Sequence, residues 1–171
     1  MTRRTGFTLI EILIVVAIIG ILAAIAIPGS VRARATANES ATAGNLHTLV
    51  NSLEMYRAVQ HFYPGSAAGW QAAMYGVDCN PATQPVPDFG PAQFCQSMNT
   101  SFIQGYLYTY TAGAATNALT YRITADPAVF GQSGSRAFFV DESGQIRHCI
   151  GATGATAASA RLDQPPGNSC P

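Results

Sequence analysis

Glu11 is the residue in this sequence that most needs a chemical partner, because its carboxylate lies inside a long apolar run. The run extends from Phe7 to Ile27 and is interrupted only by Thr8 and Glu11. A charge in a membrane-spanning segment is costly unless it meets an opposite charge, so such a residue usually has a pairing role. The alternative is an interfacial glutamate whose side chain reaches the lipid headgroups. Its position alone leaves both interpretations open.

Four cysteines form the second reactive set, and all of them follow the apolar run. They are Cys79, Cys95, Cys149 and Cys170. An even number of cysteines beyond a membrane segment indicates disulfides formed in an oxidising compartment. Of the three pairings that four cysteines allow, we expect the sequential one, which closes two short loops. Reduced buried thiols are the alternative, and zinc is disfavoured because the spacing of zinc ligands is missing.

Other side chains capable of chemistry do not form a recognisable set. His47, His61 and His148 lie far apart in the sequence without ligand spacing, and we expect the first two to be surface or capping residues. The sequence contains no nucleophile elbow, phosphate-binding loop or paired-acid motif. Three tyrosines at alternate positions, Tyr106 to Tyr110, have the spacing of a ligand-stacking row, but cross-strand packing explains them more simply. We therefore predict no catalytic residues, no cofactor and no metal site.

Length and composition limit the classes of protein. The 171 residues are enough for one domain, and 48% apolar residues are too many for a disordered chain. Nine arginines balance nine acidic residues, so the formal net charge is zero. Proteins that bind nucleic acids usually carry a basic surplus, and we predict no nucleic-acid partner.

The apolar run itself predicts a membrane-directed helix. Its 21 residues would span about 30 Å, the thickness of the hydrocarbon core of a bilayer. Arg3 and Arg4 precede it, as the basic region of a secretory signal would. An ordinary signal has a shorter apolar core, so cleavage after Ala24-Ile25-Ala26 is the less favoured alternative.

The residues from Arg3 to Glu11 read RRTGFTLIE and closely resemble the N-terminus of type IV pilins and pseudopilins. The resemblance covers roughly the first 30 residues, through the apolar run to Pro28. It implies cleavage by a prepilin peptidase between Gly6 and Phe7, followed by N-methylation of Phe7. Glu11 then becomes the fifth mature residue, where the family has its signature glutamate.

The resemblance also implies partners for the helix. In the family, this glutamate is thought to neutralise the N-terminal amine of a neighbouring subunit during filament assembly. Burying either charge alone is strongly unfavourable, whereas the pair is tolerated. The implied partners are other copies of the chain in a helical filament, the membrane before assembly, the prepilin peptidase, and an inner-membrane platform with its ATPase.

Pro28 and Gly29 predict a kink or a locally melted turn, after which a helix resumes from Ser30 to Gln60. It should end at Tyr63-Pro64-Gly65. One face of the resumed helix is apolar and should pack on a globular head. This face comprises Leu46, Leu49, Val50, Leu53, Tyr56 and Val59. The opposite, polar face comprises Arg32, Arg34, Asn38, Glu39, Asn45, Asn51 and Arg57.

An irregular stretch from Gly65 to Met98 follows, with a short helix near 67–75 and four prolines: Pro81, Pro85, Pro87 and Pro91. Strands are then predicted over 106–111, 118–125, 136–141 and 145–150. Leu119 should share a face with Tyr121 and Ile123. Glu142-Ser143-Gly144 joins the last two strands as a hairpin turn. Asp141, Glu142 and Asp126 could also suggest the calcium loop of major pseudopilins, but a plain turn is favoured.

These patterns predict an α+β fold in which a long N-terminal helix packs on an antiparallel sheet of about four strands. The expected parts are a leader (1–6), a transmembrane and assembly helix (7–28), an amphipathic helix (29–62) and a head (63–171). The interpretation is a pilus-like filament subunit, first in the inner membrane and then on the cell surface. A type II secretion pseudopilin in the periplasm is the main alternative. A membrane-anchored binding or adhesin module is the second, and a tethered enzyme the least favoured.

Overall fold

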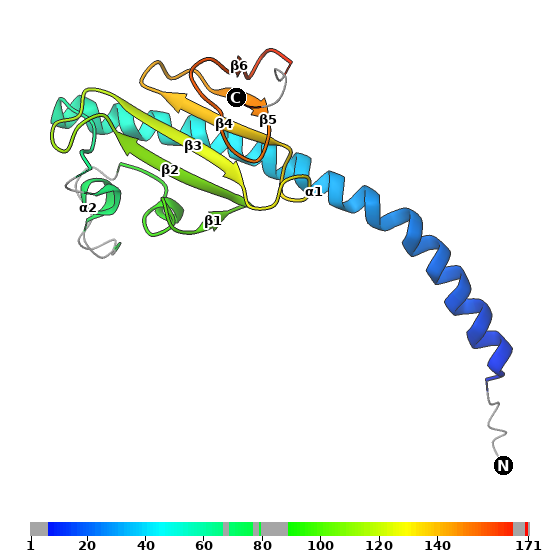
Figure 1. Cartoon of the computed structure of the whole chain (residues 1–171). Coiled ribbons are helices and arrows are strands. Elements are labelled where there is room, and N and C mark those ends of the chain that lie inside the picture. The colour runs from blue at the N-terminus through cyan, green and yellow to red at the C-terminus, as the bar shows by residue number, and fades with distance from the viewer. Residues whose placement is uncertain (1–6, 67–68, 77–78, 80–88, 166–169, 171) are drawn as a thin grey trace.

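A single helix, α1, runs from Leu9 to Gln60 and forms the axis of the molecule (Figure 1). The computed structural model describes residues 7–66, 69–76, 79, 89–165 and 170. Thr8 caps the N-terminus of α1 in an extended conformation, with φ −84° and ψ 151°. His61 ends the helix in the left-handed conformation, with φ 68°, and its amide bonds to the Arg57 carbonyl. The helix therefore ends just before the predicted Tyr63-Pro64-Gly65 stop.

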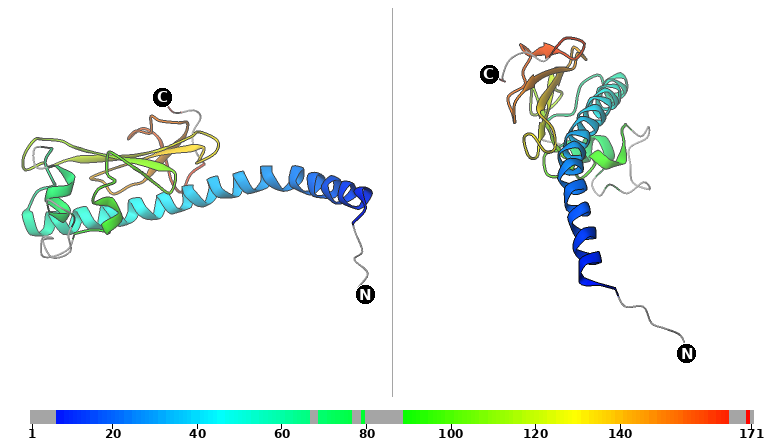
Figure 2. Two further views of the ribbon diagram at one scale, coloured as in Figure 1. Left: turned by 90° about the horizontal axis from the view of Figure 1, so that it is seen from below. Right: turned by 90° about the vertical axis from the view of Figure 1, so that its right-hand side faces the viewer.

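The local melting predicted at Pro28 is wrong, because α1 is helical through this residue. A proline removes only one N–H group, and bending relieves the clash of its ring with the preceding turn. The part of α1 outside the head follows a gradual curve in Figures 1 and 2. The segment that was predicted to resume as a helix after Pro28 is therefore a continuation of the same helix, α1.

The second half of α1 packs on the head as its apolar stripe predicts. Leu46, Leu49 and Leu53 are fully buried, and Tyr56 is nearly so. Val59 departs from the prediction, since it is 48% exposed. Glu39 departs in the other direction: it was placed on the polar face, yet it is buried because it meets partners from the sheet.

The sheet has six antiparallel strands, where about four were predicted, in the sequential order β1-β2-β3-β4-β5-β6. Its strands are β1 (Phe102–Ile103), β2 (Tyr106–Ala112), β3 (Tyr121–Pro127), β4 (Arg136–Asp141), β5 (Arg147–Ile150) and β6 (Ala160–Arg161). The two unpredicted strands have only two residues each, too few to show alternation. Figures 1 and 2 show the sheet lying along one side of α1.

Two strands, β3 and β5, begin later in the chain than predicted. Leu119 is 77% exposed and precedes β3, because the Gly113 amide bonds to the Thr120 carbonyl and closes a loop there. The predicted strand from residue 145 begins at Arg147, while the hairpin between β4 and β5 is confirmed. The Asp141 carboxylate accepts the amide and the hydroxyl of Ser143, as expected of a plain turn.

Tyrosines at alternate positions of β2 fill the core between sheet and helix, which confirms the packing interpretation. Tyr106 and Tyr108 are fully buried, and Tyr110 is nearly so. Their hydroxyls are also satisfied: Tyr106 donates to the Arg136 carbonyl, Tyr110 donates to the Pro64 carbonyl, and Tyr108 accepts from Asn45. Buried tyrosines of this kind contribute packing without leaving unpaired polar atoms.

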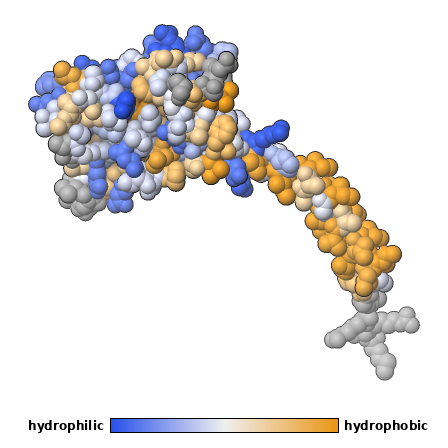
Figure 3. Space-filling model, in the orientation of Figure 1, coloured by the Kyte–Doolittle hydropathy of each residue, from blue (hydrophilic) through white to orange (hydrophobic). Residues whose placement is uncertain are grey.

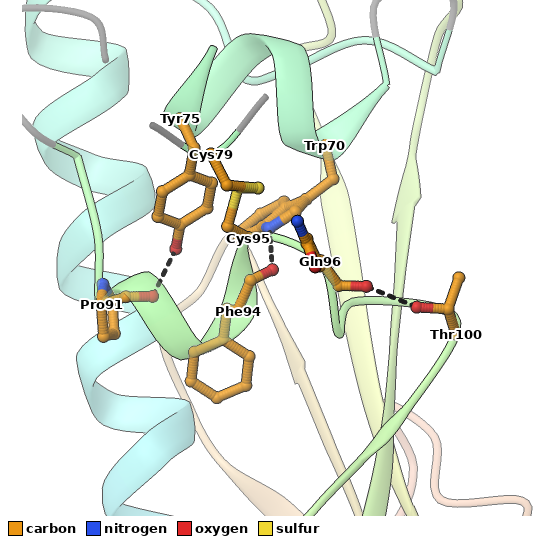
Figure 4. The surroundings of a disulfide bond; sticks show 8 residues. All are labelled: Trp70, Tyr75, Cys79, Pro91, Phe94, Cys95, Gln96 and Thr100. Atoms are coloured by element: carbon orange, nitrogen blue, oxygen red, sulfur yellow. Dashed lines mark hydrogen bonds between the residues drawn. A yellow bond between two sulfur atoms is a disulfide. The ribbon is translucent and has the colours of Figure 1, made fainter. Parts of the chain in front are cut away.

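The region between α1 and the sheet is held by one disulfide, Cys79–Cys95, with a Cα–Cα distance of 5.9 Å (Figure 4). It contains α2 (Trp70–Tyr75), which lies within the predicted short helix, and the 3-10 turn η1 (Ala92–Phe94). The Trp70 indole donates to the Phe94 carbonyl at 3.0 Å. Three of the predicted loop prolines, Pro81, Pro85 and Pro87, lie outside the described residues.

A second disulfide, Cys149–Cys170, ties the C-terminal segment back to β5, with a Cα–Cα distance of 5.1 Å. The Cys170 amide also bonds to the Ile150 carbonyl. Beside this bond a small apolar cluster forms, separate from the main core, from Ala137, Phe139 and Ala155. The two bonds join the cysteines in the sequential order that was expected.

Candidate functional site

The N-terminal end of α1 brings Glu11 and Thr8 together in a capping box. The Glu11 Oε2 accepts the Thr8 amide at 2.8 Å and the Thr8 hydroxyl at 2.7 Å. The Thr8 Oγ1 accepts the Glu11 amide at 3.4 Å in return. This reciprocal arrangement satisfies donors that a helix N-terminus otherwise leaves unpaired. Glu11 therefore has a local role in starting the helix.

Sequence reasoning missed this role, although the signal was present. The residues from Thr8 to Glu11 read TLIE, which is the S/T-x-x-E spacing of a capping box before an apolar run. Both donors of Thr8 go to one oxygen of the carboxylate. Within the described part of the chain, the Glu11 Oε1 receives no hydrogen bond, so it is the oxygen available to an external cation.

The apolar side chains that follow Glu11 are not covered by the head. From Ile12 to Ile27 the large apolar residues are all more than half exposed, and Figure 3 shows a hydrophobic stem projecting from a mixed head. This helix is long and apolar enough to cross a membrane. An apolar surface of this extent requires a lipid or protein environment. Pro28 lies at the head-side end of this stem.

The predicted cleavage site lies at the edge of the described residues. Gly6 and the leader, including Arg3 and Arg4, are outside them. Phe7 is 84% exposed and directly precedes the Thr8 cap. A new N-terminal amine at Phe7 would therefore stand next to the capping box of its own subunit.

A second arrangement of charges lies where α1 enters the head. The Glu39 carboxylate accepts the amide and hydroxyl of Ser135 at 2.7 and 2.8 Å, and Arg136 binds its other oxygen at 2.7 Å. Burial raises the pKa of the Glu39 carboxyl, but the bonds from Ser135 and Arg136 together outweigh it and hold this pKa below its ordinary value. The cluster fixes the head to the helix, and sequence reasoning did not anticipate it.

His148 extends this cluster toward the C-terminal segment. Its Nε2 lies 3.1 Å from the Gln164 carbonyl, which can only accept, so Nε2 carries the proton. Nδ1 lies 3.3 Å from the Arg136 guanidinium and accepts from it. Burial lowers the pKa of His148, and the positive charge of Arg136 acts in the same direction. The neutral ring is therefore the form that fits this site.

The remaining candidates do not converge on one site. His47 is exposed on α1, and His61 is the C-cap of that helix, as expected of surface or capping residues. Among the described residues, no three histidine, cysteine or acidic side chains are grouped so that they could hold a metal ion. Asp126 on β3 belongs to no such group within the part of the chain that the structure describes. Burial raises the pKa of its carboxyl to about 6.

Comparisons with known proteins match the N-terminal features. Residues 1–27 match the family model of the prokaryotic N-terminal methylation motif. The chain is similar to the type II secretion system core protein G of Klebsiella pneumoniae, with 31% identity over 90 residues. It is also similar to the type IV major pilin protein PilA of Myxococcus xanthus, with 37% identity over 103 residues. The chain is therefore similar to type IV pilins and pseudopilins.

The pilin and pseudopilin relatives are matched over part of their lengths. The two matches cover 53% and 52% of this chain, and 64% and 47% of the respective relatives. The type IV wide pilus major component PilA4 of Thermus thermophilus is 44% identical over 68 residues, 40% of this chain and 52% of that protein. The chain thus spans less than two thirds of the length of each of these relatives. No solved structure matches it significantly.

Proposed function

We propose that this chain is a structural subunit of a type IV pilus-like filament, made as a membrane precursor. A prepilin peptidase cleaves it between Gly6 and Phe7, and Phe7 is then N-methylated. The mature subunit polymerises through α1, served by an inner-membrane platform and its ATPase. Residues 7–28 are the membrane and assembly part of α1, residues 29–62 join it to the head, and residues 63–171 form the head.

The main support for this proposal is that the apolar side chains of the N-terminal half of α1 are exposed. The same side chains would face lipid in the precursor and neighbouring helices in a filament, so assembly exchanges one apolar environment for another. The methylation motif lies at the start of this surface, and relatives of the chain are named as pilus components. The chain's role is structural, and no catalytic step is assigned to it.

Glu11 would act in this assembly through the oxygen that the capping box leaves open. The Thr8 donors hold Oε2, and Oε1 would accept the Phe7 amine of a neighbouring subunit. Charge-assisted pairing in an apolar environment is strongly directional, so it would set the axial register between subunits. A carboxylate left without that amine would be unfavourable at the same place.

A type II secretion pseudopilin is the second candidate, because relatives named type II secretion system core protein G match over a similar share of the chain. It shares all the N-terminal features and would form a periplasmic pseudopilus. The Cys149–Cys170 bond near the C-terminus favours the pilin, since many type IV pilins have a disulfide-bounded C-terminal loop. A membrane-anchored adhesin module would instead keep its leader.

Mass spectrometry of sheared surface filaments tests the proposal. If the chain is a pilin, we expect the protein to be abundant in these filaments, to begin at methylated Phe7 and to contain both disulfides. A processed protein found only in the periplasmic fraction would support the pseudopilin. An uncut protein found only in membranes would refute both filament readings.

Variants of Glu11 test the mechanism. Glu11→Ala and Glu11→Val should abolish or cripple assembly while leaving membrane insertion intact. Glu11→Gln is the matched control, because its amide oxygen can still accept from Thr8 but it carries no charge. We expect it to fail in assembly as well. Normal filaments from Glu11→Gln would show that capping, rather than charge pairing, is what assembly needs.

A further inference from the structure

Two arginines, Arg32 and Arg34, stand on α1 between the hydrophobic stem and the head. Both are exposed. Within the part of the chain that the structure describes, neither guanidinium has an ion-pair or hydrogen-bond partner. The sequence has no acidic residue between Glu11 and Glu39, and Glu39 is already paired with Arg136. This segment of α1 therefore carries two uncompensated positive charges.

Their height on the helix corresponds to the headgroup layer of a bilayer. If the run from Phe7 to Ile27 spans the hydrocarbon core, Arg32 and Arg34 lie about 6 and 9 Å beyond Pro28. The polar layer on each side of a bilayer is about 5 to 8 Å thick. Arginine side chains are long enough to reach back along a helix to that layer. Both guanidinium groups can thus meet lipid phosphates without moving the helix.

The head itself stands farther from the membrane. Asn38, the first residue of α1 that bonds to the head, donates to the Ser133 carbonyl at 2.9 Å. It lies about 15 Å beyond Pro28, which is outside the headgroup layer when α1 is upright. The exposed apolar residues Val129 and Phe130 belong to the same head loop as Ser133. Lipid contact is therefore assigned to the arginines and not to this loop.

The two arginines point to different sides of α1, which favours lipid over a single protein surface. Residues two apart on a helix are separated by about 200° around its axis. Figure 3 shows hydrophilic side chains projecting from opposite sides of the stem next to the head. One neighbouring subunit would engage one side, whereas lipid headgroups surround the helix.

We propose that Arg32 and Arg34 bind the phosphate groups of anionic phospholipids in the leaflet on the head side of the membrane. Guanidinium groups pair with phosphates through two parallel hydrogen bonds, which suits this contact. The contact would hold the unassembled subunit at a set depth and would have to break when the subunit leaves the membrane. This inference rests on the membrane-anchored precursor of the proposed function.

Native mass spectrometry of the full-length chain released from nanodiscs tests it. The nanodiscs contain equal amounts of phosphatidylglycerol and phosphatidylcholine, and the retained lipids are counted. The unaltered chain should retain phosphatidylglycerol preferentially. Arg32→Gln with Arg34→Gln should lower that preference by about fivefold per arginine removed. Because Arg3 and Arg4 remain in every variant, their contribution cancels.

Arg122→Gln with Arg161→Gln is the matched control, since both side chains are exposed on the head and the loss of charge is the same. It should retain phosphatidylglycerol as the unaltered chain does. Equal loss in both double variants, or no loss in either, would overturn the proposal. Normal lipid retention combined with failed filament assembly in the Arg32 and Arg34 variant would assign these residues to a second copy of the chain and would also overturn it.

The two proposals fail in different ways. A chain that does not enter nanodiscs at all contradicts the membrane anchor and, with it, the lipid contact. A chain that enters but shows no preference overturns the lipid contact alone. Filaments that begin at methylated Phe7 would then still support the proposed function.

Discussion

Glu39 on α1 and Arg136 on β4 form a 2.7 Å ion pair at the junction of helix and head, although 97 residues separate them in the sequence. The Glu39 side chain is 7% exposed and that of Arg136 is 27% exposed. Ser135 donates to the same carboxylate, so three polar groups of the sheet side converge on one residue of the helix. The pair therefore adds a polar contact to the buried leucines of α1 in holding the head on the helix.

Glu39→Gln should destabilise the head. The substitution leaves the Arg136 guanidinium partly buried without its counter-charge, and breaking such a pair costs about 3 kcal/mol. Urea unfolding followed by the fluorescence of Trp70, the single tryptophan, would measure the free energy of unfolding. Glu142→Gln is the control, because Glu142 is exposed on a turn and its loss should change stability by less than about 0.5 kcal/mol. Equal stability of the two variants would contradict this role of Glu39.

His148 should make the head less stable as the pH falls below about 6.5, the ordinary pKa of histidine. Burial lowers the pKa of this ring in the folded state, so the unfolded chain takes up the proton first. The folded state then loses up to about 1.4 kcal/mol per pH unit until the folded-state pKa is reached. A protonated Nδ1 would also face Arg136.

The measurement is the difference in unfolding free energy between the unaltered chain and His148→Gln from pH 7.5 to pH 5. A glutamine does not titrate, so the difference should shrink as the pH falls. His47→Gln, at an exposed position on α1, is the matched histidine control. A constant difference for His148→Gln would rule out the mechanism.

Asp126→Asn should stabilise the head at pH 7.5 by about 1 kcal/mol, a value reduced for the partial exposure of this side chain. Within the described residues, its Oδ1 is buried without a hydrogen-bond partner. Burial raises the pKa of the Asp126 carboxyl to about 6, so its contribution to stability is full below pH 3.8 and is lost as the pH rises through about 6.

Thermal unfolding at pH 7.5 and at pH 3.5 would test this. The gain from Asp126→Asn should be present at the higher pH and nearly absent at the lower, where the carboxyl is neutral as well. Asp163→Asn, at an exposed position, is the matched control. A gain that is the same at both values would mean that charge burial is not the cause.

Removing the C-terminal disulfide through Cys149→Ala and Cys170→Ala should cost about 3 kcal/mol, as expected for closing a loop of this size. The loss should be local at first, because the bond supports the small cluster of Ala137, Phe139 and Ala155 on the sheet. Hydrogen exchange should therefore accelerate in β5 before it accelerates in α1. Uniform acceleration across the head would indicate instead that this segment belongs to the main core.

Patterns within one element were predictable from the sequence because their causes are local. The strand over Arg136–Asp141 and the turn that follows it match the prediction, since alternation and turn residues act over a few positions. Leu46, Leu49, Leu53 and Tyr56 of the stripe are buried for the same reason. The strands β1 and β6, which were not predicted, have two residues each. They form because β2 and β5 offer backbone groups to pair with, and not because of their own composition.

Pro28 and Val59 show the limits of local rules. A proline in a helix removes one hydrogen bond, and a long helix absorbs this by bending, so the predicted local melting does not occur. Val59 was placed on the apolar stripe, yet it is 48% exposed. Spacing shows which face an apolar residue occupies but not whether another element covers that face.

The sequence by itself determined the membrane-length apolar run, the TLIE spacing of the helix cap and the methylation motif, because each of these depends on neighbours in the chain. Only the tertiary structure decided that Glu39 is buried against Ser135 and Arg136, and that His148 connects Arg136 to the Gln164 carbonyl. A buried charge is stable inside a protein only when its partners are supplied, and the partners of Glu39 lie 96 and 97 residues away in the chain. Local patterns in the sequence do not show which residues so far apart in the chain will meet.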